Sequence, residues 1–262
     1  MTSNSHLVAA SGETDLSIPL SNNHPYQLQD EKAKEYLNDP KYAKYVQLVE
    51  RNLQSFDYVS EWADVTAFLT KLSRAFEIYS QFDVIPHKDT VAKRLAQCLN
   101  PALPTGVHQK ALQLYHQIFE KIPSKQLAAD LPRYSFGLFP FLRNAALKVK
   151  PQVLALFEKY YLPMGAKLRP CAKSFIIALL PGLEEERSEV YERVIKLLDK
   201  IKTLTDPSFF YQTIFLVMIS NPELRLCVLN YLSARIRVLA TAEDLAELTG
   251  GDSGLIVRAI AA

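Results

Sequence analysis

The fold class is decided by the stretch Val107-His-Gln-Lys-Ala-Leu-Gln-Leu-Tyr-His-Gln-Ile118, whose apolar residues recur at intervals of three and four. Val107, Ala111, Leu114, Tyr115 and Ile118 share one stripe, which is typical of an α-helix that buries one face. Working outward, the same spacing returns in residues 68–79, 153–160, 168–179 and 190–201. No window of that length alternates polar and apolar residues as a half-buried strand would, so the chain is predicted to be all-α.

Proline is expected to separate these helices, because its ring removes a backbone donor and clashes with the preceding turn. Prolines recur from Pro86 to Pro222 and include Pro132 and Pro140. We therefore predict about ten antiparallel helices joined by short turns. Such hairpins close as a bundle or stack as a solenoid, and we favour an irregular HEAT/armadillo-like α-solenoid because those repeats are degenerate in sequence.

Three segments are expected along the chain. Residues 1–37 are rich in Ser, Asn and Thr, with no cation before Lys32, and are predicted to be a disordered tail. Residues 38–249 form the helical domain. Residues 250–262 read as the truncated start of a following segment, so we expect the N-terminal piece of a longer protein. The longest uncharged stretch, Pro207–Pro222, falls short of the ~20 apolar residues of a membrane span, and no secretory signal precedes it.

No catalytic or metal-binding constellation emerges, so the chain is predicted not to be an enzyme and to need no cofactor. Gly251-Asp-Ser-Gly254 matches a serine-protease nucleophile string, but that chemistry needs a β-barrel with a His and an Asp. None of the five histidines has a metal-ligand spacing, and Cys98, Cys171 and Cys227 read as buried thiols of a reducing compartment. Glu184-Glu-Glu186 is expected to favour the positive end of the next helix.

The charge is distributed unevenly. The chain of 262 residues has a net charge of +2, yet residues 88–183 carry 14 Lys and Arg against 4 Asp and Glu, while every other part is net acidic. Near the middle, Lys148 and Lys150 precede the helix expected from Pro151. A second basic group surrounds the other end of that helix, roughly 16 Å away.

The second basic group is the candidate binding site, and it consists of Lys159, Lys167, Arg169 and Lys173. Arg169 and Lys173 are four residues apart and are expected on one helical face, off the apolar stripe. Each cation near an anionic membrane contributes about 1 kcal/mol, enough together for weak, reversible contact. The alternative is a pure protein-interaction module whose basic centre binds an acidic partner. Nucleic acid is not expected, because no aromatic residues interleave with these cations.

One long string is recognisable as a family signature. Lys93-Arg-Leu-Ala-Gln-Cys-Leu-Asn-Pro-Ala-Leu-Pro-Thr-Gly-Val-His-Gln-Lys-Ala-Leu-Gln-Leu-Tyr115 closely resembles the N-terminal domain of the Dopey family. Tyr134-Ser-Phe-Gly-Leu-Phe-Pro140, Tyr160-Tyr-Leu-Pro163 and Leu180-Pro-Gly-Leu-Glu-Glu185 agree with it in order.

The resemblance implies a non-catalytic scaffold of endosome-to-Golgi traffic, cytoplasmic and peripheral on Golgi and endosome membranes. It implies a Sec7-related HEAT-repeat scaffold as partner, with an aminophospholipid flippase and kinesin as further partners. It also implies weak binding of phosphatidylinositol 4-phosphate, which suits the four cations above. Lys93, Arg94, His108 and Lys110 flank the Pro101–Pro104 loop and are the polar residues predicted to contact the scaffold partner, although a structural role for the loop itself is the stronger expectation.

Overall fold

The structure of the chain, a computed structural model, describes residues 32–186 and 188–236. Within those ranges it is helical and contains no strand, as the apolar stripes predicted. Ten α-helices have defined bounds: α2 (Pro40–Ser55), α3 (Trp62–Ile78), α4 (Lys88–Gln97), α5 (Thr105–Lys121), α6 (Ser124–Asn144), α7 (Lys150–Leu156), α8 (Ala172–Leu179), α9 (Glu189–Thr205), α10 (Pro207–Ser220) and α11 (Arg225–Ile236). Shorter segments link them: η1 (Phe56–Tyr58), the π-helix η2 (Phe157–Tyr161), η3 (Leu162–Cys171), η4 (Leu180–Leu183) and η5 (Pro222–Leu224).

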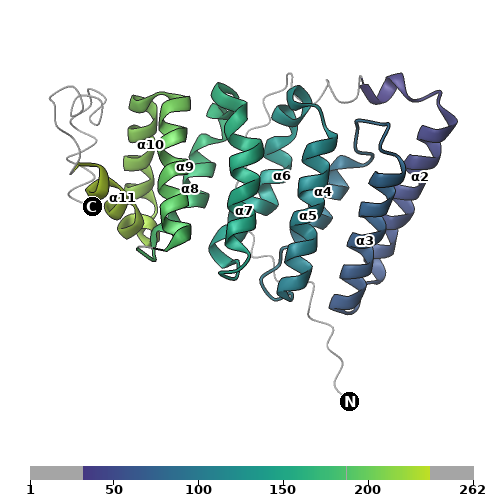
Figure 1. The fold of residues 1–262 in the computed structure, drawn as a ribbon, viewed down its shortest axis with the longest axis horizontal. Helices are drawn as coiled ribbons and strands as arrows, with labels where there is room; N and C mark the ends of the chain where they lie inside the picture. Colours follow the sequence, from purple (N-terminus) through teal and green to yellow (C-terminus); the bar gives the residue numbers. More distant parts are fainter. Residues whose placement is uncertain (1–31, 187, 237–262) are drawn as a thin grey trace, which may run out of the picture.

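Successive helices alternate between two rows that run along the long axis of the molecule (Figure 1). One row consists of α2, α4, α6, α8 and α10, and the other of α3, α5, α7 and α9. Each helix contacts its neighbours within a row, and short turns carry the chain across to the other row. The helices of the two rows therefore bury residues between the rows, while α11 packs against α10 and η4 at the end of the stack.

Aromatic rings fill the space between the rows. Phe139 of α6 stacks on Phe175 of α8 with ring centroids 5.3 Å apart and planes 7° apart. Phe157 and Tyr161 of the π-helix close on both rings at 5.0–5.8 Å. Such pairs contribute about 0.5–1.5 kcal/mol each beyond the burial of their area. They fix α6, η2 and α8 relative to one another.

The prediction that proline separates helices is wrong at Pro132 and Pro140, which both lie inside α6. Both rings point to the exposed side of the helix, while Leu131, Tyr134 and Leu138 are buried against the neighbouring row. A proline inside a helix costs about 3 kcal/mol. Burial of the inward residues on both sides of each proline outweighs that cost, so the helix continues.

The predicted tail, residues 1–37, lies outside the described residues up to residue 31. Its last part differs from the expectation, because residues 32–35 are helical and Tyr36 packs against the domain. The Tyr36 ring meets Phe82 at 5.1 Å, its hydroxyl donates to Asp83 at 3.0 Å, and Lys32 pairs with the same carboxylate. Burial of one aromatic ring together with two polar contacts offsets the entropy of ordering these few residues.

The glutamate run does not begin the helix that follows it. Glu184, Glu185 and Glu186 are exposed and precede α9, whose N-cap is Ser188. The Ser188 hydroxyl accepts a hydrogen bond from the Tyr191 backbone N–H at 3.0 Å, and the acids of the first turn are Glu189 and Glu192. A hydroxyl cap satisfies a free N–H directly, which a carboxylate several residues upstream does not.

Some sequence predictions lie outside the described residues: the Gly251–Gly254 string, His6, His24 and the expected segment 250–262. Among the described helices, none is by itself long and apolar enough to cross a membrane. Within the described residues, one pair of helices reaches the length and hydropathy of a membrane span when taken together. This pair is α10 and the helix after it, and the two are bent by 116°.

Candidate functional site: a basic segment beside α8

The described residues contain no group of three or more His, Cys, Asp and Glu side chains that could hold a metal ion. His108 is buried and its Nε2 lies 2.9 Å from the Asn100 carbonyl oxygen, while His116 hydrogen-bonds to Tyr160. Burial raises the pKa of the Cys98 thiol to about 12 and that of Cys171 to about 11. These thiols therefore stay protonated and unreactive near neutral pH.

The four residues predicted to contact a scaffold partner are mostly engaged within the domain. Arg94 pairs with Asp57 and lies over the Phe56 ring at 4.8 Å. His108 is buried as described, and Lys110 donates to the Thr70 hydroxyl at 2.9 Å. Only Lys93, exposed on α4, has no polar partner within the part of the chain that the structure describes.

Lys159 lies on the π-helix and differs from the other three cations of the predicted lipid site because it is held in an ion pair. Its ammonium is 2.6 Å from the Glu120 carboxylate of α5, which also accepts a hydrogen bond from Tyr160 at 2.9 Å. The hydrogen bond from Lys159 is the main reason that the pKa of Glu120 is lowered. Since this ammonium already has a counter-charge, it has less attraction left for an external anion.

Lys167, Arg169 and Lys173 form what we call the basic segment, and all three are exposed. They follow a sharp kink at Gly165, whose φ of 56° and ψ of −131° suit a residue without a Cβ. Arg169 belongs to η3 and Lys173 to α8, and the chain between them departs from α-helical geometry at Cys171 (φ −106°, ψ 1°). The expected regular helical face for these two residues is therefore absent.

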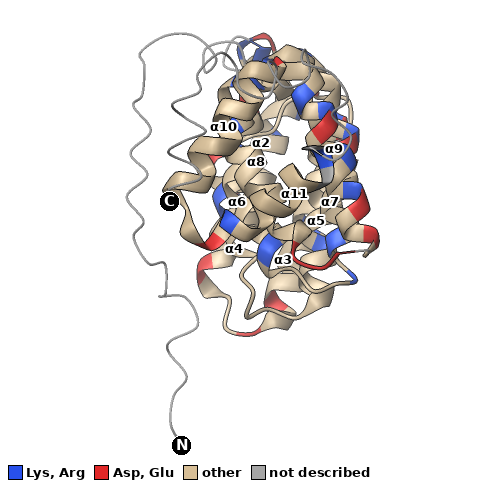
Figure 2. Ribbon diagram, turned by 90° about the vertical axis from the view of Figure 1, so that its left-hand side faces the viewer, with Lys and Arg blue, Asp and Glu red and all other residues tan. Residues whose placement is uncertain are grey.

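Among the described residues, no ion pair involves the basic segment, and few acids lie near it in the chain. Between Leu131 and Leu183 the single acid is Glu158, and its two oxygens accept bonds from Arg193 of α9 at 3.1 and 2.8 Å. Arg169 rests on the Phe209 ring of α10 at 5.1 Å, a contact that leaves its charge unneutralised. Figure 2 shows α10 wholly uncharged, whereas α9 carries residues of both signs.

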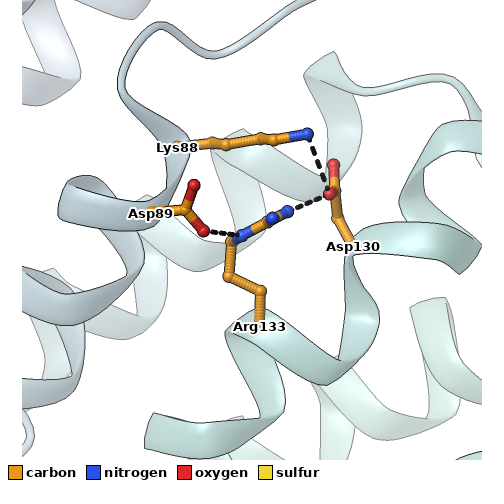
Figure 3. A network of polar contacts seen from close by, with 4 residues as sticks. All are labelled: Lys88, Asp89, Asp130 and Arg133. Carbon is orange, nitrogen blue, oxygen red and sulfur yellow. Dashed lines mark hydrogen bonds and ion pairs between the residues drawn. The ribbon is translucent and has the colours of Figure 1, made fainter. Parts of the chain in front are cut away.

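A polar network between α4 and α6, buried at Asp130 and Arg133, was missed by sequence reasoning (Figure 3). Arg133 donates to both Asp130 and Asp89, and the Lys88 ammonium lies 3.5 Å from Asp130. Asp130 is only 2% exposed, and its pKa is raised because burial outweighs the two neighbouring cations. The spacing of Asp130 and Arg133 suggests their own contact, but nothing in the sequence links either to α4.

Over residues 32–186 and 188–236, the fold and this surface define a class of protein: two rows of helices with an exposed basic segment that forms no ion pair there. The chain belongs to the Dopey family, since the family described as "Dopey, N-terminal" matches residues 39–262. This agrees with the resemblance of the Lys93–Tyr115 string.

Relatives from animals and fungi are similar to the chain over most of its length. "Protein DOP1B" of Mus musculus is 40% identical over 233 residues, which is 89% of this chain and 10% of that protein. "Protein pad-1" of Caenorhabditis elegans is 38% identical over 224 residues, covering 86% and 9%, and "Protein DOP1" of Saccharomyces cerevisiae is 36% identical over 214 residues, covering 79% and 13%. The chain thus spans about a tenth of the length of these relatives. No solved structure matches it.

Proposed function

We propose that this chain is part of a non-catalytic scaffold of endosome-to-Golgi traffic that touches anionic membrane through the basic segment. Lys167, Arg169 and Lys173 carry the proposal, because they are exposed cations with a single, already paired acid in the 53 residues from Leu131 to Leu183. The two-row arrangement is consistent with a HEAT/armadillo-like solenoid, a fold that presents long surfaces to partners. Membership of the Dopey family supports the trafficking role and a Sec7-related HEAT-repeat scaffold, a flippase and kinesin as partners.

Lys159 has a lesser part in this proposal. It was predicted to act with the other three, but its ammonium is paired with Glu120. Breaking this ion pair costs free energy, which reduces what a lipid contact of Lys159 could contribute. The lipid chemistry is that of phosphatidylinositol 4-phosphate, whose phosphomonoester gives charge-assisted hydrogen bonds with Lys and Arg.

The triple variant Lys167→Glu, Arg169→Glu, Lys173→Glu is expected to lose membrane binding. Loss of three contributions of about 1 kcal/mol each weakens binding by roughly 100-fold or more. The measurement is co-sedimentation with liposomes that contain phosphatidylinositol 4-phosphate, compared with liposomes of equal charge made with phosphatidylserine.

The control variant changes three exposed lysines at the other end of the molecule, Lys41→Glu, Lys44→Glu and Lys71→Glu. It has the same net charge as the test variant and should bind liposomes nearly as the unchanged chain does. Equal loss in both variants would show that only the overall charge matters. Undiminished binding by the test variant would refute the lipid role and leave the second candidate, a protein-interaction module that forms a salt-sensitive complex with an acidic partner.

A further inference from the structure

The outward face of α6 is apolar where a solvent-facing helix is usually polar. Pro132, Phe136 and Pro140 follow one another at four-residue intervals and are all exposed, and Phe136 is 79% exposed. A single exposed apolar residue is ordinary, whereas a line of three on one helical face is typical of a contact surface. The two prolines also lack an N–H, so the carbonyl oxygens of Ala128 and Phe136 do not receive the usual helical donor.

A hollow opens beside Phe136, between α6 and α4. It has a volume of about 260 Å³ and is lined by Asp89, Ala92, Lys93, Arg133 and Phe136. That volume is below the ~300–1,000 Å³ typical of small-molecule sites, and it suits side chains of a docked polypeptide better than a cofactor. Phe136 at its edge is the kind of aromatic anchor that dominates binding at protein interfaces.

The charges around the hollow indicate what the partner must carry. The one carboxylate in its lining, Asp89, accepts from Arg133 (Figure 3). The other lining cation, Lys93, is exposed and has no polar partner among the described residues. The charge without a partner in the lining is therefore the positive charge of Lys93, which lies next to the apolar ring of Phe136.

We propose that this hollow is a docking site for a short protein segment that carries a carboxylate next to a bulky apolar side chain. The carboxylate pairs with Lys93, and the apolar side chain packs against Phe136 and Ala92. A protein segment fits better than a membrane, because a hollow beside the Phe136 ring takes up single side chains, whereas a bilayer presents a broad surface. The inference rests on the proposed scaffold role, but it uses none of the residues of the basic segment.

The experiment selects ligands from a displayed library of random 16-residue peptides against the 262-residue chain. The expected result is enrichment of peptides that combine an acidic with a bulky apolar residue. Their affinity should fall at least tenfold for Phe136→Ser and for Lys93→Glu, while Tyr58→Ser, which removes another exposed aromatic ring, leaves it unchanged. Exchange of the peptide acid for lysine should restore binding to Lys93→Glu.

Unchanged urea unfolding midpoints for Phe136→Ser and Lys93→Glu show that these variants remain folded, since both side chains are exposed. Selected peptides without acids, or peptides that bind Phe136→Ser as tightly as the unchanged chain, would overturn the proposal. So would two other occupants of this face: a second copy, seen as self-association abolished by Phe136→Ser, or a bilayer, seen as liposome binding lost in Phe136→Ser with peptide affinity intact. The triple variant of the basic segment decides the lipid role separately.

Discussion

Replacement of Gly137 by alanine is expected to destabilise the domain by about 3 kcal/mol, because the added methyl has no room between α6 and α4. A Cβ at this position would lie 2.6 Å from the Tyr115 hydroxyl oxygen, 2.8 Å from the Ala96 Cβ and 2.9 Å from the Ala96 Cα. The last contact is with backbone, so the two helices must separate to relieve it. The gain of up to about 1 kcal/mol in helix propensity does not compensate.

Urea unfolding of the purified chain measures this effect. The matched control is Gly106→Ala in α5, where nothing lies within 4 Å of the added methyl, and it should leave stability unchanged or raise it by up to about 1 kcal/mol. Tyr115→Phe combined with Gly137→Ala should recover only part of the loss, because the contacts with Ala96 remain. A Gly137→Ala variant as stable as the unchanged chain would mean that α4 and α6 are not held at this distance.

Arg133→Met is expected to cost about 3–5 kcal/mol at pH 7, the usual effect of removing one partner of a buried ion pair. Asp130 would keep only the Lys88 ammonium at 3.5 Å while remaining almost fully buried. Arg143→Met is the control, since Arg143 pairs at 3.1 Å with Glu223 where both side chains are about half exposed, and its loss should cost less than about 1 kcal/mol.

The cost of Arg133→Met should decrease as the pH falls from 7 to 5. The pKa of Asp130 is already raised in the folded state, and the loss of a neighbouring cation raises it further. A carboxyl with a raised folded-state pKa binds its proton more tightly when folded, so acid stabilises the folded variant relative to the unfolded one. A second change, Asp130→Leu, in the same variant should recover most of the stability at pH 7 and abolish this pH dependence. A cost that stays constant between pH 7 and pH 5 would argue against a buried, charged Asp130.

Local sequence patterns were enough to predict that the helices exist, but not at which residues they begin and end. The stripe from Val107 to Ile118 predicts α5, because amphipathic spacing has the same meaning in any all-helical fold. Pro132 and Pro140 were misjudged, because the burial that outweighs their cost comes from other helices. Tyr36 was assigned to the tail for the same reason: its partners, Phe82 and Asp83, lie more than 40 residues further on.

The candidate site likewise has features that the sequence predicts and others that depend on the tertiary structure. That Lys167, Arg169 and Lys173 lie in an acid-poor region could be read directly from the charge count. That Lys159 is paired with Glu120, that Arg94 is paired with Asp57 and that His108 is buried depended on how the helices and their connections pack.

The sequence by itself determined the all-helical class, the Dopey family and the excess of cations in the middle of the chain, because these depend on residue type and short-range spacing. The tertiary structure alone decided which cations are free, that Asp130 and Arg133 join α6 to α4, and that Phe136 is left exposed beside a hollow. The physical reason is that ion pairing, burial and close approach depend on distance in space, and side chains 39 or 44 residues apart in sequence meet only when the helices pack.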